Sequence, residues 1–171
     1  IDEFKGSASG EKFQCILTDL NQRQVFDILP TRKQEDLFAY FAHFRDKTNV
    51  KHIVMDMSRS YLEVARTCFP SATVVIDKFH VARYCTWAFE NVRKRVQKKL
   101  YAHERKYFKR SRRLLLARMK TLSDENKLAV ERMLSYSVDL KNAYILKEYF
   151  YEFMDSKDKL QAQEKLKWFR M

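Results

Sequence analysis

HIVMD (residues 52–56) and TVVID (residues 73–77) are two short apolar runs that each end in an aspartate, and one helical segment separates them. This order is typical of two parallel strands joined by a helical crossover. Ligands in open sheets bind beyond the carboxyl ends of the strands, so we expect Asp56 and Asp77 in neighbouring positions at the edge of a site. Paired carboxylates at such an edge commonly hold a divalent cation.

Three further strands are expected before this stretch. Residues 13–17 and 24–29 are rich in β-forming side chains and a polar segment separates them, which predicts a hairpin. Residues 1–4 would pair beside it as a third, antiparallel strand. Gly6 and Gly10, the two glycines of the chain, bracket the connecting turn.

Helix signals alternate with the strands. Capping boxes that begin at Thr31 and Ser60 predict the starts of two helices, and the second helix should end before Pro70. The resulting order, β-β-β-α-β-α-β, is that of a ribonuclease H-like mixed sheet. The expected fold class is therefore α/β.

After Lys78 the strand signals end, and the rest of the chain is expected to be all-helical. Apolar side chains recur with helical spacing from Val81 to Leu100. Further helix starts are expected at Ser123, Asp139 and Ser156. With 171 residues, 46% of them apolar, the chain is expected to bury a single core.

Positive charge is concentrated in residues 93–120. This basic block holds 13 Lys and Arg and a single acid, Glu104, so the net charge of +12 arises there. Such a block is stabilised by a polyanion, and its aromatic residues offer stacking surfaces, which favours nucleic acid as the partner. A solvated helical face and a basic helix at a membrane surface are the alternatives.

Other features exclude several function classes. The three cysteines are far apart and form no Cys-x-x-Cys pair, so neither a disulfide framework nor a zinc ribbon is expected, and a reducing compartment fits. No apolar run approaches the roughly 20 residues of a membrane span, and no signal peptide opens the sequence. The chain opens on what reads as the end of a strand, so we expect an excised fragment.

Asp2 is the third acid that the expected sheet places near the strand ends. In a core of this type the first strand lies beside the first parallel strand, so Asp2 would come close to Asp56. Two such carboxylates repel each other unless a cation neutralises them, and oxygen ligands favour Mg²⁺ or Mn²⁺ over Zn²⁺. The alternative is that Asp2 is a turn residue and Asp56 a helix N-cap.

Several motifs of the chain resemble, in order, those of the DDE transposase domain in bacterial insertion sequences of the ISL-three type. They are DEFKG (residues 2–6), VMDMS (54–58) with Tyr61, FPSA (69–72), DKFHV (77–81) and Tyr144-x-Leu146-Lys147-Glu148. The resemblance implies a ribonuclease H-like catalytic domain in which Asp2, Asp56 and Glu148 match the acidic triad. Such triads hold two divalent cations, Mg²⁺ or Mn²⁺, and catalyse DNA cleavage and strand transfer.

The resemblance also implies partners and a location. The partner is DNA, both transposon ends and target, and the active complex is expected to be a homo-oligomer in the bacterial cytoplasm, on the nucleoid when bound to DNA. No membrane and no small-molecule substrate are expected. The zinc-binding and helix-turn-helix regions expected upstream are absent from this sequence, so recognition of the element's ends is not expected of this piece alone.

Two site assignments remain open at this point. Asp77 and His80 match an Asp-or-Cys-x-x-His element of related transposases, and they are expected to support the site or to form a structural pair. Helical geometry does not separate Glu148 from Glu152 as the third acid; only the motif favours Glu148.

The expected domains follow from these assignments. Residues 1–82 form the N-terminal part of the core, 83–138 a basic helical insertion, and 139–171 the C-terminal helices that carry the third acid. The insertion would bind DNA phosphates without sequence preference. The candidate contacts are Arg93, Lys94, Arg95, Lys98, Lys99, Arg112 and Arg113.

Two alternatives to a transposase catalytic domain remain. One is a catalytically inactive fragment that binds DNA or its partner subunits, and the other is a ribonuclease H-like nuclease or resolvase. The presence of all three acids favours an enzyme over the inactive fragment.

Overall fold

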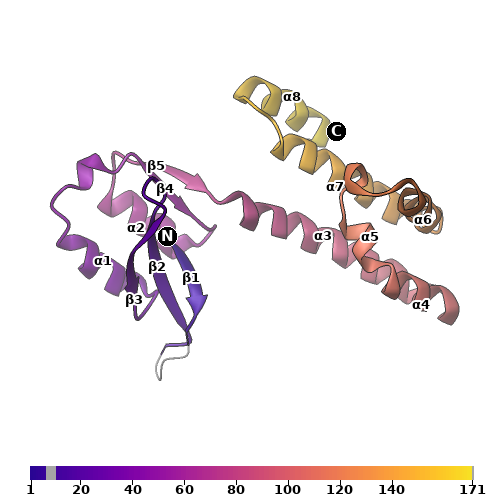
Figure 1. The fold of residues 1–171 in the computed structure, drawn as a ribbon, viewed down its shortest axis with the longest axis horizontal. Helices are drawn as coiled ribbons and strands as arrows, with labels where there is room; N and C mark the ends of the chain where they lie inside the picture. Colours follow the sequence, from indigo (N-terminus) through magenta and orange to yellow (C-terminus); the bar gives the residue numbers. More distant parts are fainter. Residues whose placement is uncertain (7–10, 171) are drawn as a thin grey trace. The chain divides into compact units, whose positions relative to one another are not determined.

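The computed structural model describes residues 1–6 and 11–170, which fall into two compact units, Ile1–Val81 and Ala82–Met171 (Figure 1). Each unit has its own cluster of buried side chains. The expected turn at Gly6 and Gly10 lies partly outside the described residues, since these stop at Gly6 and resume at Glu11.

The first sheet of unit 1 is antiparallel. Its strands, in the order β1-β2-β3, are β1 (Asp2–Lys5), β2 (Phe13–Asp19) and β3 (Gln24–Leu29). The hairpin prediction is confirmed. Asp19 stabilises the hairpin turn, because its carboxylate accepts hydrogen bonds from the backbone N–H groups of Asn21 and Gln22. Cys15 and Leu17, two residues apart on β2, turn the same face of the sheet into the core.

The second sheet of unit 1 is parallel. The elements that build it are α1 (Gln34–Ala42), η1 (Lys47–Asn49), β4 (His52–Met55), α2 (Arg59–Cys68) and β5 (Thr73–Ile76). The predicted order of elements along the chain, β-β-β-α-β-α-β, and the α/β class are confirmed, whereas the ribonuclease H-like strand order is not. The described strands form two small sheets, however, and a single mixed sheet is not observed among residues 1–6 and 11–170.

Helix α2 covers the parallel pair because its apolar residues recur at helical spacing. Tyr61, Val64, Ala65 and Cys68 are all buried, and they pack with side chains of α1 and of β4. Figure 1 shows α1 and α2 on the strands of this unit. This cluster forms the core under the candidate site.

The capping boxes predicted at Thr31 and Ser60 are wrong. Helix α1 begins at Gln34, and the Thr31 hydroxyl instead accepts the backbone N–H of Lys33 in the turn before it. Helix α2 begins at Arg59, with Ser58 at the N-cap. A hydroxyl can accept a backbone N–H in a turn as readily as at a helix end. The position of such a hydroxyl in the sequence therefore differs from the true helix start by a few residues.

Helix α3 (Lys78–Lys98) begins in unit 1 and continues into unit 2, as the helical spacing predicted. The remaining elements are α4 (Ala102–Arg110), α5 (Arg112–Leu116), η2 (Met119–Thr121), α6 (Asp124–Leu134), α7 (Val138–Met154) and α8 (Lys159–Arg170). Helices α7 and α8 lie side by side (Figure 1). Among the described residues, no helix has the length and apolar character that crossing a membrane requires.

The expectation of a single core is wrong. Unit 2 buries a second cluster, to which α3, α4, α5, α6 and α7 all contribute; its fully buried members include Phe108, Leu115, Val130, Met133 and Leu140. The apolar content of a chain fixes how much surface can be buried and not how many clusters share it.

Helix starts in unit 2 follow the predictions in part. Ser123 caps α6, because its hydroxyl accepts the N–H of Asn126. Helix α7 is capped by Ser137 in place of Asp139. At α8 the carboxylate of Asp158, and not Ser156, accepts a backbone N–H of the first turn.

The two clusters can be tested separately, because both tryptophans, Trp87 and Trp168, belong to unit 2. Leu115→Ala empties a fully buried site in unit 2 and should cost about 2–5 kcal/mol. The measurement is urea unfolding followed by tryptophan fluorescence. Leu37→Ala, an equally buried leucine of unit 1, is the matched control and should leave the tryptophan transition unchanged. Equal shifts for both variants would show that the clusters do not unfold separately.

Candidate functional site

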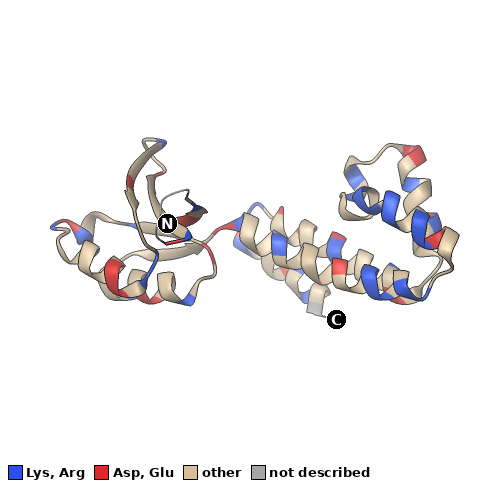
Figure 2. Cartoon of the chain, turned by 90° about the horizontal axis from the view of Figure 1, so that it is seen from below, with Lys and Arg blue, Asp and Glu red and all other residues tan. Residues whose placement is uncertain are grey.

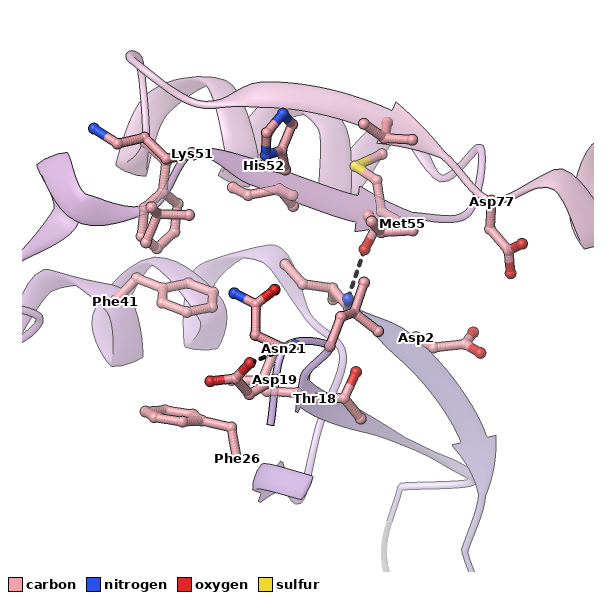
Figure 3. Close-up of a pocket in the computed structure, with 18 of the residues that line it drawn as sticks. Asp2, Thr18, Asp19, Asn21, Phe26, Phe41, Lys51, His52, Met55 and Asp77 are labelled. Atoms are coloured by element: carbon pink, nitrogen blue, oxygen red, sulfur yellow. Dashed lines mark hydrogen bonds between the residues drawn. The ribbon is translucent and has the colours of Figure 1, made fainter. Parts of the chain in front are cut away.

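A cleft of about 790 Å³ lies between the two sheets of unit 1 (Figure 3). Leu17 and Thr18 of β2 line one wall, Ile53 and Met55 of β4 line the other, and Phe41 of α1 lies between them. Asp2, Asp56 and Asp77 also line this cleft. The three acidic side chains therefore lie in a cleft whose lining is mixed, with apolar side chains beside polar ones such as Asp19 and Asn21.

The parallel register brings Asp56 and Asp77 together. Met55 pairs with Ile76 at the end of the ladder, and the Asp77 N–H donates to the Met55 carbonyl at 2.7 Å. The next residues along the two strands, Asp56 and Asp77, therefore lie opposite each other. The neighbouring positions expected from the sequence are confirmed by this register.

Asp2 joins them through one backbone contact between the sheets. The Ile1 nitrogen donates to the carbonyl of Val54 at 2.7 Å, which holds the start of β1 against β4 (Figure 3). Asp2, Asp56 and Asp77 thus all line the same cleft. Figure 3 shows the Asp2 and Asp77 side chains at the same end of the strands.

Each of these three carboxylates is held by a backbone N–H of its own segment. The donor is Glu3 for Asp2 (2.8 Å), Ser58 for Asp56 (2.8 Å) and Phe79 for Asp77 (2.9 Å). In every case the acceptor is Oδ1, and within residues 1–6 and 11–170 no hydrogen bond reaches the Oδ2 atoms. One oxygen of each side chain is therefore fixed and the other is available.

The alternative interpretation, in which Asp2 is a turn residue and Asp56 a helix N-cap, is wrong. Asp2 lies in β1 rather than in a turn, and Ser58, not Asp56, is the N-cap of α2. Asp56 instead forms a turn of its own ahead of the helix by accepting the Ser58 N–H.

His80 lies close to both Asp2 and Asp77. Its Nε2 is 3.8 Å from Asp2 Oδ1 and 3.9 Å from Asp77 Oδ2, and only 17% of its side chain is exposed. These separations are too long for hydrogen bonds, so the contacts are electrostatic and form when the imidazole is protonated. His80 thus lies near both Asp2 and Asp77, and the supporting role of Asp77 and His80 stays a prediction.

The described part of the chain contains no preformed metal-binding site. Among residues 1–6 and 11–170, no three His, Cys, Asp or Glu side chains are grouped so that they could hold an ion.

Glu148 lies in unit 2, on α7, in surroundings unlike those of Glu152. Its Oε1 is 2.8 Å from Nζ of Lys147, its Oε2 accepts the Met119 N–H at 3.1 Å, and 22% of the side chain is exposed. Glu152, one turn later, is exposed and its carboxylate has no partner among the described residues. The two candidates for the third acid therefore differ in that only Glu148 is held in place.

A sequence model of the DDE transposases of the ISL-three type matches residues 1–170. The chain belongs to this transposase family. The resemblance in the sequence motifs is thereby confirmed. Neither the comparison with curated proteins nor that with solved structures gives a match.

The basic block of this transposase is partly neutralised from within. Arg93, expected at the DNA, is 4% exposed and donates to Glu90, which is itself buried, and to Gln97. Arg112 also donates to Glu90, at 2.8 Å, and Arg95 pairs with Asp139 at 3.5 Å. Arg93 is therefore removed from the set of candidate DNA contacts, because its guanidinium is used inside the unit.

The remaining predicted contacts of the transposase are exposed. Figure 2 shows the Lys and Arg positions along the helices of unit 2. Helix α4 adds cations that the sequence prediction left out. The exposed Lys and Arg of this surface without an ion pair among the described residues are Lys94, Lys98, Lys99, Arg105, Lys106, Lys109, Arg110 and Arg113. We call these eight residues the cationic surface.

Two contacts of charged residues in unit 2 could not be predicted from the sequence. Glu90 was missed because a single acid ahead of a basic run is typical of a solvated helix face. Its i, i+3 spacing from Arg93, within a helix of otherwise regular apolar period, is the signal that could have revealed it. The contacts of Glu148 with residue 119 were missed because they connect segments 29 residues apart.

Glu90→Gln should destabilise unit 2 strongly. The change leaves the buried Arg93 without a counter-charge, and breaking such a pair costs about 3–5 kcal/mol. Urea unfolding followed by tryptophan fluorescence measures the loss. Glu131→Gln, an exposed position on α6, is the control and should change stability by less than about 0.5 kcal/mol.

The loss of stability caused by Glu90→Gln should depend on pH. Burial alone would raise the pKa of Glu90, but hydrogen bonds from Arg93 and Arg112 hold it below the ordinary carboxyl value. The stabilisation is therefore full above the unfolded-state pKa and is lost as the pH falls through the lower folded-state pKa. The difference between wild type and Glu90→Gln should be largest near neutral pH and shrink in acid; a constant difference would contradict it.

Proposed function

We propose that the chain is the catalytic domain of a DNA transposase that cleaves phosphodiester bonds and transfers DNA strands with divalent cations. Asp2, Asp56 and Glu148 are the proposed ligands and catalytic residues, on a ribonuclease H-like framework. The observation that carries the proposal is that three strand-end carboxylates line one cleft of unit 1, in a chain that belongs to a DDE transposase family.

The donor chemistry of unit 1 fits a hard cation. Mg²⁺ keeps several water ligands and is commonly bound by one or two carboxylates together with substrate phosphates. The unoccupied Oδ2 atoms of Asp2 and Asp56 supply two such oxygens, and neither sulfur nor a hydrogen-bonded imidazole competes with them. When bound, a pair of divalent cations activates the attacking water or DNA 3′-hydroxyl and stabilises the leaving oxygen.

The residues of the chain orient the metal-binding carboxylates and balance their charge. The backbone N–H groups of Glu3 and Ser58 fix the orientation of the Asp2 and Asp56 carboxylates, so that little reorganisation is needed. Protonated His80 would offset part of the charge of Asp2 and Asp77, or bind a DNA phosphate.

The cationic surface is proposed to bind the DNA backbone. Eight exposed cations are enough for phosphate contacts that give affinity without sequence preference. The transposon ends and the target are the proposed DNA substrates, and the active complex is proposed to be a homo-oligomer that works on the bacterial nucleoid.

Asp56→Asn tests the catalytic part of this proposal. The change removes the ligand charge and keeps the Oδ1 acceptor for the Ser58 N–H, so the turn before α2 should remain. In the full-length protein, magnesium-dependent nicking of transposon-end DNA should fall by at least about 100-fold, with DNA binding unchanged. Asp19→Asn makes the same exchange at the carboxylate of the hairpin turn, where the Oδ1 acceptor is also kept, and is the matched control. Normal cleavage by Asp56→Asn would refute the assignment.

Charge reversal at Lys98, Lys99 and Arg113 tests the interface. Affinity for unrelated duplex sequences should weaken about equally, and the slope of log affinity against log salt should fall by about 0.9 for each DNA phosphate that is no longer neutralised. Binding is measured by fluorescence anisotropy between 50 and 200 mM salt, a range over which a protein that neutralises about 6 to 10 phosphates weakens by about 10³ to 10⁵ in affinity. Lys127→Glu, which reverses a cation paired with Asp124 on α6, is the control. Weakening confined to one sequence would contradict backbone binding.

A further inference from the structure

The segment of residues 117–120, between α5 and α6, is attached to α7 by four successive residues. The Ala117 carbonyl accepts from Nζ of Lys147 at 2.5 Å, and the Met119 N–H donates to Glu148. Arg118 and Lys120 both donate to Asp155, at 2.6 and 2.8 Å. We call this segment the clasp. It is the end of the basic block, and it holds the stretch of α7 that carries Glu148.

Lys147 is the innermost part of this arrangement. Its side chain is 1% exposed, and its ammonium lies 4.1 Å from the centre of the Tyr144 ring. Burial lowers the pKa of Lys147, whereas the neighbouring Glu148 acts to raise it. An apolar side chain of similar volume would fill the same space at no desolvation cost. The presence of a lysine here is therefore not explained by packing.

The Glu148 carboxylate explains it, because both of its oxygens are oriented by this network. The Lys147 ammonium forms an ion pair with Oε1 at 2.8 Å, without hydrogen-bond geometry, and the Met119 N–H donates a hydrogen bond to Oε2. A glutamate on an open helix face has three rotatable bonds and would otherwise sample many directions. Groups that contact a metal-binding carboxylate in this way commonly set its orientation and basicity.

We propose that Lys147 and the Met119 N–H are positioning groups that hold the Glu148 carboxylate in the direction needed to bind a divalent cation. The inference rests on the proposed function, in which Glu148 is the third acid. It assigns Lys147 a task in the reaction that is separate from stabilising unit 2.

Met119 allows this task to be separated from folding. It is the first residue of η2, where proline is well tolerated, and Arg118 before it is extended (φ −79°, ψ 135°), as a residue that precedes proline prefers. Met119→Pro therefore removes the N–H that Glu148 accepts and leaves the carbonyl that Leu122 uses. Met119→Ala loses the same side chain but keeps the N–H, and is the matched control.

The test compares Met119→Pro, Met119→Ala, Lys147→Met and Lys147→Arg in the full-length protein. The measurements are Mn²⁺ binding by electron paramagnetic resonance of the free ion, Mn²⁺-dependent DNA cleavage, duplex DNA binding and thermal unfolding. For Met119→Pro and Lys147→Met, the Mn²⁺ concentration for half-maximal binding and cleavage should rise by about 10- to 100-fold. Met119→Ala should match wild type, Lys147→Arg should recover part of the loss, and DNA binding should not change.

Each outcome decides the proposal. If Met119→Pro and Met119→Ala show the same Mn²⁺ dependence, the positioning role is refuted, even where Lys147→Met lowers the melting temperature, because that loss alone would be structural. If wild type cleaves DNA and Glu152→Gln rather than Glu148→Gln abolishes cleavage, the inference fails and the transposase function stands. If wild type neither binds Mn²⁺ nor cleaves transposon-end DNA, the proposed function fails, and this inference with it.

Discussion

The parallel pairing of β4 with β5 is the constraint on which the acidic end of unit 1 depends. In a parallel ladder, residues that follow a matched pair leave the sheet side by side, so Asp56 and Asp77 are neighbours by backbone geometry alone. The crossover helix α2 keeps the two strands in this register, because its buried face packs on β4 and α1. Asp77 then leads directly into α3, whose first turn carries His80. The first turn of α3 is thus fixed by the same ladder.

The part of the fold that depends on short-range patterns could be predicted from the sequence. Two apolar runs separated by one amphipathic helix have few alternatives to a β-α-β unit, and the polar segment that contains Asp19 allowed little besides a hairpin. Helix starts were less certain, because several hydroxyl and carboxylate side chains compete to cap the same turn. Ser58 is the N-cap of α2 without a side-chain hydrogen bond, whereas the Ser137 hydroxyl accepts the Leu140 N–H at the start of α7.

Contacts between distant helices could not be predicted, and they decide the role of the charged residues. Arg93 belongs to a basic run, yet it is buried on Glu90, and Lys147 lies in a helix with many polar residues, yet it is almost completely enclosed. A helical period identifies a face and not its neighbour, so a charged residue on a partly apolar face is read as solvated. The division into two clusters has the same origin, because composition does not show which helices meet.

Whether each of the three acids is an aspartate or a glutamate follows from where its hydrogen-bond donor lies. Asp2 and Asp56 bond to an N–H within two residues of themselves, and only a side chain with a single methylene closes so small a ring without strain. Glu148 reaches a donor on a separate segment, for which an aspartate would be too short. Two aspartates and one glutamate are therefore not interchangeable carboxylates in this chain, and the length of each side chain is dictated by its anchor before any ligand is considered.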